Sequence, residues 1–154
     1  MKPMMLGACL AAIAGQADAL SCNFGNTASA WVEAEQIGDP FITVRGTFWM
    51  RDAWRSFEEE DYVLPARFEG VIINADGTTT PLKTPVQVIG ACINGDCGYV
   101  GPRVELVTFL HGSADARIAY SMPCSSYPVD TSQDTMADLL ACMNGDVCTP
   151  EFAF

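Results

Sequence analysis

Hydrophobic and polar residues alternate along several stretches of the chain with the period of two that is typical of half-buried β-strands. In residues 41–49, for example, Ile42, Val44 and Phe48 alternate with polar side chains. Comparable patterns occupy four further stretches, residues 62–74, 81–93, 104–111 and 116–124. A turn at residues 112–115 joins the last two. The pattern therefore predicts five strands, of which the last two form a hairpin.

Near the C-terminus the hydrophobic period changes from two to that of a helix. Apolar residues there follow the spacing i, i+3, i+4 and i+7, as Met136, Leu139, Leu140 and Met143. Thr131 or Ser132 can cap the start of this helix, and Gly145 fits just past its end. Five short strands and one helix predict a mainly β domain, either a partly open Greek-key barrel or a sandwich, with the helix packed on the sheet.

The first residues have the pattern of a secretory signal peptide. Lys2 precedes an apolar run that ends at Ile13, and Ala17-Asp18-Ala19 matches the small-residue cleavage site. We expect cleavage after Ala19, so that residues 1–19 are the signal peptide and residues 20–154 form a single domain. The expected location is therefore periplasmic or secreted.

Two alternatives to a cleaved leader are less consistent with the sequence. A membrane-spanning helix needs about 20 continuous apolar residues, and Gly15, Gln16 and Asp18 interrupt this run too early. The segment Leu6-Gly7-Ala8-Cys9 has the letters of a lipidation box, but it leaves too short an apolar core before Cys9. We therefore expect no stable membrane anchor.

The chain is strongly acidic, with a formal net charge of −11. Excision of the leader removes Lys2 and Asp18, one charge of each sign, and leaves this value unchanged. Such a charge repels nucleic acid and anionic lipid. The cations of the mature chain are scattered along the sequence, which gives no indication of a phosphate-binding stripe; they are Arg45, Arg51, Arg55, Arg67, Lys83, Arg103 and Arg117.

Excision of the leader also removes Cys9, and an even number of cysteines in an exported chain indicates a disulfide framework. The remaining six are Cys22, Cys92, Cys97, Cys124, Cys142 and Cys148. Turn-forming Asn-Gly pairs lie between Cys92 and Cys97 and between Cys142 and Cys148, so both pairs can close locally. This leaves Cys22 to pair with Cys124. A zinc site is not expected, because His111 is the only histidine, and no cofactor is predicted.

Several short motifs, in order along the chain, resemble the netrin-like domain, whose best-known members are the tissue inhibitors of metalloproteinases. They include Arg45-Gly46-Thr47, Phe68-Glu69-Gly70, Cys97-Gly98 and Pro128-Val129-Asp130-Thr131. The resemblance implies a five-stranded OB-fold-like Greek-key barrel with a C-terminal helix. It also implies protease inhibition as a possible function and Cys22–Cys97 as an alternative disulfide.

The chain departs from this family at its amino terminus. In the inhibitors, as the resemblance implies, a Cys-x-Cys pair begins the mature chain and its first cysteine binds the catalytic zinc of the protease. Here Asn23 and Phe24 follow Cys22, so the second cysteine is missing. The expected cleavage also leaves Leu20 and Ser21 ahead of Cys22, and these two residues would prevent the amine of Cys22 from binding a metal.

The segment 48–57 contains tryptophan and arginine, residue types that are enriched at binding hot spots. It connects the first two strands, a position from which OB-folds recognise ligands. The candidate binding residues are Trp49, Trp54, Arg55 and Phe57, together with Tyr99. The alternative is structural: Trp49 and Trp54 cover one end of the barrel, and the acidic run that follows is a solvated face.

Sequence motifs of enzymes are absent: there is no G-x-S-x-G elbow, no H-E-x-x-H pair and no glycine-rich phosphate loop. His111, at the end of a strand, is expected to be an ordinary surface or capping residue. The sequence therefore favours an exported, non-enzymatic binding or protein-interaction module with a protein partner in the cell envelope or outside the cell. The alternatives are a netrin-like protease inhibitor and a small hydrolase that uses His111 with a carboxylate.

Overall fold

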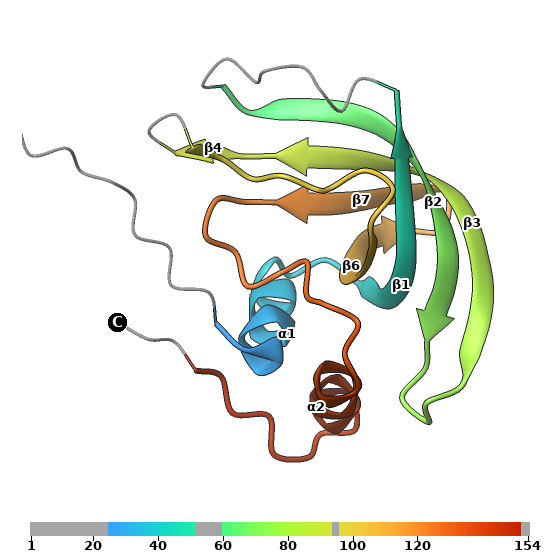
Figure 1. Ribbon diagram of the computed structural model, residues 1–154, viewed down its shortest axis with the longest axis vertical. Helices are drawn as coiled ribbons and strands as arrows, with labels where there is room; N and C mark the ends of the chain where they lie inside the picture. The colour runs from blue at the N-terminus through green and yellow to red at the C-terminus, as the bar shows by residue number, and fades with distance from the viewer. Residues whose placement is uncertain (1–24, 52–59, 94–95, 152–154) are drawn as a thin grey trace, which may run out of the picture.

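A computed structural model describes residues 25–51, 60–93 and 96–151 of the chain. Five strands close into a barrel in the order β1-β2-β3-β7-β6 (Figure 1). Their bounds are β1 (Phe41–Met50), β2 (Tyr62–Ile73), β3 (Thr79–Gly90), β6 (Glu105–Ser113) and β7 (Ala116–Ser121). Neighbours are antiparallel except β3 and β7, which run parallel. The predicted OB-fold-like barrel is confirmed, and the sandwich alternative is wrong.

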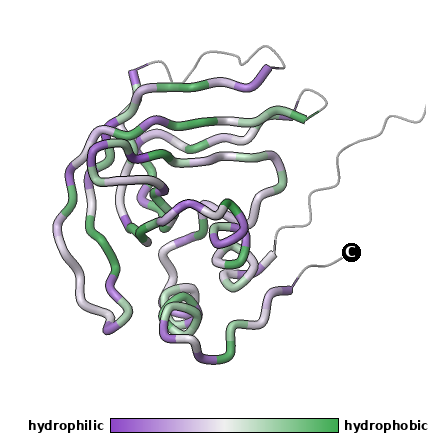
Figure 2. The backbone as a smooth tube through the Cα atoms, turned by 180° about the vertical axis from the view of Figure 1, so that it is seen from behind, coloured by the Kyte–Doolittle hydropathy of each residue, from purple (hydrophilic) through white to green (hydrophobic). Residues whose placement is uncertain are grey.

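The alternating pattern of β1 forms the barrel because every second side chain points inward. Val44 and Phe48 are fully buried there, and Figure 2 shows hydrophobic and hydrophilic positions alternating along the strands. Gly46 faces Gly70 across the β1–β2 pair. A Cβ atom on Gly70 would lie 2.2 Å from the Arg45 carbonyl oxygen, so only glycine lets the two strands approach this closely.

Two of the predicted strands are shorter than the pattern indicated. The stretch 81–93 splits at Ala91, whose backbone N–H bonds to the Ser121 carbonyl, and a small hairpin of β4 (Cys92–Ile93) and β5 (Asp96–Cys97) follows. The stretch 116–124 ends at Ser121, before Pro123, which cannot donate to a ladder. Hydrophobicity alone does not mark these ends, because the residues beyond them are also apolar or half-buried.

Two helices cover one outer face of the barrel, α1 (Thr27–Gln36) and α2 (Gln133–Met143) (Figure 1). The predicted C-terminal helix is confirmed, with Ser132 as its N-cap and Gly145 beyond its end at φ +72°. The first helix was not predicted, because its buried residues are small: Thr27, Ala28, Ser29, Ala30 and Ala34. Neither of these described helices is long and apolar enough to span a bilayer.

The apolar side chains form two cores that share strand β6. The barrel core comprises Val44, Phe48, Phe68, Val86, Val88, Val100, Leu106, Leu110 and Ala119. The helix layer, between the barrel and the two helices, comprises Ala30, Ala34, Ile73, Val107, Phe109, Tyr127 and Leu139. Strand β6 contributes Leu106 and Leu110 to the first and Val107 and Phe109 to the second. It is therefore buried on both faces.

Two of the predicted disulfides are present, Cys92–Cys97 and Cys142–Cys148. The first closes the β4–β5 hairpin, so the alternative Cys22–Cys97 pair is wrong. Cys124 is also disulfide-bonded; its predicted partner, Cys22, lies outside the described residues.

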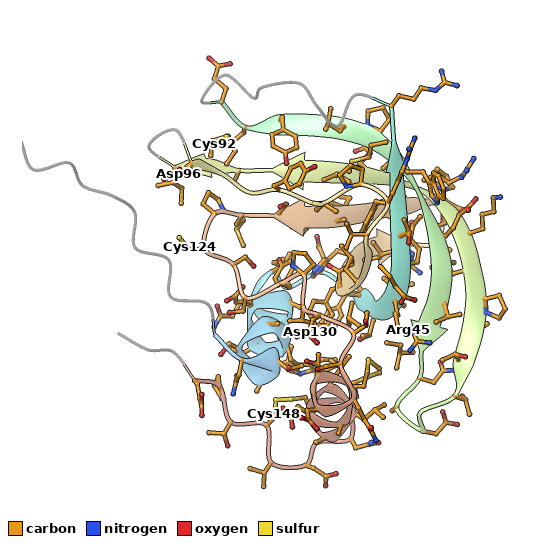
Figure 3. The ribbon with its side chains drawn as sticks, in the orientation of Figure 1. Arg45, Cys92, Asp96, Cys124, Asp130 and Cys148 are labelled. Carbon is orange, nitrogen blue, oxygen red and sulfur yellow. A yellow bond between two sulfur atoms is a disulfide. The ribbon has the colours of Figure 1, made fainter. Side chains whose placement is uncertain are left out.

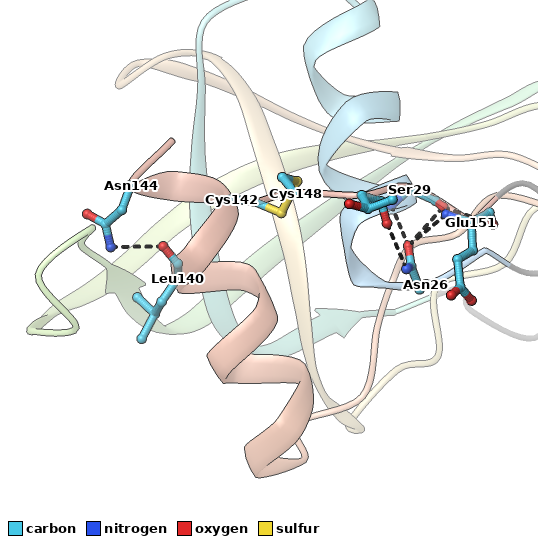
Figure 4. The surroundings of a disulfide bond; sticks show 8 residues. Asn26, Ser29, Leu140, Cys142, Asn144, Cys148 and Glu151 are labelled. Atoms are coloured by element: carbon cyan, nitrogen blue, oxygen red, sulfur yellow. Dashed lines mark hydrogen bonds between the residues drawn. A yellow bond between two sulfur atoms is a disulfide. The ribbon is translucent and has the colours of Figure 1, made fainter. Parts of the chain in front are cut away.

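The C-terminal segment after Cys148 runs back to the start of α1 (Figure 4). There the Ser29 hydroxyl donates to the Glu151 carbonyl, and the backbone N–H of Glu151 donates to the Asn26 side chain. The second disulfide and these bonds together join the two helices.

Candidate functional site

The candidate binding residues from the sequence do not form one cluster in the described structure. Trp54, Arg55 and Phe57 lie in residues 52–59, outside the described part of the chain. Trp49 is 42% exposed and Tyr99 is 48% exposed, but they line two different cavities. The structure therefore divides the predicted surface into two places.

Trp49 lines a cavity of about 720 Å³ where β1 and β2 separate, beyond their last pair, Met50 with Ala66. We call it the arginine cavity; its described lining consists of Trp49, Met50, Arg51, Leu64, Pro65, Ala66, Arg67 and Arg103. Met50, Leu64 and Ala66 also pack against the barrel core. The described lining thus combines apolar residues with three arginines, and the cavity volume is in the range of ordinary ligand sites.

Strand register places two of the arginines beside Trp49. On one side, Trp49 pairs with Arg67 of β2. On the other side, the backbone N–H of Arg103 donates to the Phe48 carbonyl, 3.1 Å away. The Arg103 guanidinium carbon lies 5.8 Å from the centroid of the Trp49 ring, within the range of a cation–π contact.

The backbone of Arg103 adopts a left-handed conformation, with φ of +61°. Few residues other than glycine do so, and the conformation costs free energy unless its surroundings hold it. The hydrogen bond to Phe48 and the contact with Trp49 supply such surroundings. Backbone strain of this kind is often found at ligand-binding sites, where the surrounding structure holds a side chain in one orientation.

The three arginines differ in their acidic neighbours. Arg67 Nε lies 3.0 Å from Glu69 Oε1, and Lys83 Nζ lies 2.7 Å from the same oxygen. The hydrogen bond from Lys83, with the charge of Arg67, holds the pKa of Glu69 below its usual value. Within the described ranges, neither Arg51 nor Arg103 lies within 4.0 Å of a carboxylate oxygen.

A row of mixed charge follows the arginines on the same outer face of the barrel. Thr47, two residues before Trp49 on β1, pairs with Glu69 on one side and with Glu105 on the other. Two residues along a strand span about 7 Å. Lys83 Nζ lies 2.7 Å from Glu69 and Arg45 Nε lies 3.9 Å from Glu105, so both carboxylates have a cationic partner.

The grouping of these cations was not predicted from the sequence. Arg51, Arg67 and Arg103 are scattered along the chain, yet they line one cavity. The strand pattern contains a partial signal, because a β1–β2 hairpin brings the end of one strand beside the start of the next. The position of Arg103 depends on barrel closure, which no local pattern reveals.

Tyr99 lines a second cavity, of about 660 Å³, near Cys97 and the segment 121–130. Figure 3 shows Asp96 and Cys124 of this region on the opposite side of the view from Arg45 on β1. Glu33 of α1 fixes the adjacent chain, since its carboxylate accepts hydrogen bonds from the hydroxyls of Ser125 and Ser126 at 2.7 Å each. The described lining of this second cavity includes the acidic residues Asp96 and Asp130 and no cation.

His111 is buried in the helix layer, with no exposed surface. The expected surface position is wrong, because β6 alternates between two cores and places His111 under Phe41 and Tyr120. Neither ring nitrogen makes a hydrogen bond to the residues that the structure describes. Burial lowers the pKa of His111, and Asp39 opposes this only in part. The hydrolase hypothesis gains no support from this position.

The described residues contain no group of three or more histidine, cysteine or acidic side chains arranged to hold a metal ion. No family model matches the chain, and no curated protein or solved structure is significantly similar to it. The netrin-like resemblance therefore stays a prediction. The cysteine on which inhibition would depend, Cys22, lies outside the described residues.

Proposed function

We propose that this chain is an exported, non-enzymatic binding module that engages a protein partner, in the cell envelope or outside the cell, through Trp49 and the arginine cavity. One observation carries the proposal. In a chain with a net charge of −11, Arg51 and Arg103 lack a described carboxylate partner, and both line a cavity with a partly exposed tryptophan.

Physical reasoning supports a binding role for this arrangement. An acidic chain has many carboxylates with which arginines could pair, so guanidinium groups that have no carboxylate partner among the described residues gain little for folding. Tryptophan and arginine are also the residue types that most often dominate binding energies. The OB-fold barrel recognises ligands with the loop that joins its first two strands, and the arginine cavity lies beside that connection.

The proposal can be tested by co-precipitation from the envelope and extracellular fractions of the producing cells. The wild-type protein is compared with a Trp49→Ala, Arg103→Gln variant. Arg45→Gln serves as the matched control, because it also removes one cation from the outer face of the barrel but lies outside the cavity. A partner that is recovered with wild type and control, and lost with the double variant, is the expected result.

Equal recovery of every bound protein by all three variants would contradict the proposal. Circular dichroism and urea melts of each variant show that any loss does not reflect unfolding. The double substitution removes the contact between Trp49 and Arg103 that helps to hold the left-handed backbone of Arg103, so a loss of about 1–3 kcal/mol in the free energy of unfolding is expected.

A further inference from the structure

We infer that the arginine cavity takes a single carboxylate attached to a flat apolar body, and that it rejects extended polyanions. This inference rests on the proposed function and names the chemistry of its ligand. It follows from the charged and apolar residues that line the cavity and from the net charge of the chain.

The charge of the ligand is indicated by the arginines of the cavity. The described lining of the cavity includes three arginines and no carboxylate. Guanidinium groups bind planar carboxylates through two parallel hydrogen bonds. Arg67 is already shared with Glu69, whereas Arg51 and Arg103 have no carboxylate within 4.0 Å among the described residues. One planar carboxylate can accept two hydrogen bonds from one of these guanidinium groups, and the net charge of −11 opposes a second negative charge on the ligand.

The body of the ligand is indicated by the uncharged residues of the cavity. Met50, Leu64, Pro65 and Ala66 line the same cavity as Trp49. Flat apolar groups pack on an indole face and lose their contact with water there. A small inorganic anion would leave these residues uncovered. The ligand that uses the whole lining has an aromatic or aliphatic part next to its charged group.

Extended polyanions are disfavoured by the charge of the whole chain. Glu69 and Glu105 lie about 7 Å along the strands from the row of Trp49 and Arg67. Lys83 Nζ lies 2.7 Å from Glu69 and Arg45 Nε lies 3.9 Å from Glu105, so these two carboxylates are already paired and add little repulsion. The net charge of −11 supplies long-range repulsion instead. This repulsion grows with the charge of the ligand, so a single carboxylate is opposed least.

Benzoate is the simplest probe of this class, and the readout is the NMR shift of the Trp49 indole N–H, assigned with a Trp49→Phe variant. We expect a saturable shift with benzoate at millimolar concentration and none with benzyl alcohol, which has the same ring without the charge. Arg103→Gln should weaken benzoate binding by about fivefold or more, since hydrogen bonds between charged groups are strong. Arg45→Gln should change it by less than about twofold, because its guanidinium lies outside the cavity.

Other results overturn the inference. Equal shifts with benzyl alcohol would show that charge plays no part. Tighter binding of phenyl phosphate than of benzoate would replace the carboxylate by a phosphate, and tight binding of heparin at the same residues would contradict the exclusion of polyanions. If a partner is still lost on Trp49→Ala, Arg103→Gln substitution while benzoate does not bind, the carboxylate ligand is wrong but the binding module stands.

Discussion

The fully buried side chains of the barrel core carry no ionisable group, whereas the helix layer buries His111 and the hydroxyl of Tyr127. Neither of these polar groups has a hydrogen-bond partner in the described part of the chain. The barrel core depends on close backbone contacts such as Gly46 with Gly70. The helix layer depends on edge-to-face aromatic contacts, among them Phe109 with Tyr127 and Trp31 with Phe41.

The difference shows how one strand can serve two environments. Strand β6 presents Leu106 and Leu110 to the apolar barrel core, and its other face contacts a layer in which unpaired polar groups reduce stability. We therefore expect the two cores to unfold together but to respond differently to pH. Four substitutions test this comparison, from the largest expected effect to the smallest.

Leu139→Ala truncates a fully buried side chain of α2. The lost contacts and the cavity should lower the free energy of unfolding by about 2–5 kcal/mol, as measured by urea melts. Because β6 belongs to both cores, native-state hydrogen exchange should accelerate in β1 and β2 as well as in α2. The exposed Val63→Ala should have an effect below about 0.5 kcal/mol. Acceleration in the helices alone would show that the two cores open independently.

Gly70→Ala tests the close approach of strands in the barrel core. Its Cβ would lie 2.2 Å from the Arg45 carbonyl and 2.7 Å from the Cα of Gly46, so backbone must move. A loss of about 1–3 kcal/mol in the free energy of unfolding is expected. Gly101→Ala is the control, because its Cβ would meet nothing closer than 3.5 Å. Similar melts for both variants would contradict the steric argument.

His111→Phe tests the response of the helix layer to acid. An unfolded histidine takes up a proton near its ordinary pKa of 6.5, while burial lowers the pKa of the folded one. Stability is therefore fully present above about pH 6.5 and falls as the pH decreases below it. The variant should lose this dependence between pH 7 and 5 and gain about 1 kcal/mol at neutral pH, since no unpaired nitrogen remains buried. A profile identical to that of wild type would show that His111 is not the group responsible.

Tyr127→Phe tests the same layer at alkaline pH. Burial, together with the charge of Glu33, raises the pKa of Tyr127 above its ordinary value of 10. The folded state keeps this proton where the unfolded state releases it, so stability should fall as the pH rises above about 10. In thermal melts the variant should lose less stability than wild type as the pH rises above about 10, and its stability at neutral pH should change by no more than about 1 kcal/mol. The Tyr99→Phe variant, at an exposed position, should lose as much stability above about pH 10 as wild type.

The local sequence was sufficient for the elements whose signal lies in consecutive residues. The alternation from Phe41 onward predicts β1, the spacing from Met136 to Met143 predicts α2, and the Asn-Gly turns predict the two short disulfides, because period, caps and turn chemistry act within a few residues. The hydrophobic pattern does not predict a helix whose buried residues are small, as in α1. It also does not predict the burial of His111, because that residue lies on a strand whose two faces contact two different cores.

Tertiary structure alone decided which distant residues meet. Barrel closure brings Arg103 beside Trp49, and the β1–β2 register adds Arg67, although the sequence separates them widely. No local pattern contains that information, because side-chain contacts across a barrel depend on strand order and register. The sequence by itself thus determined strands, a helix and local cross-links, while the fold assembled the arginine cavity from residues that are distant along the chain.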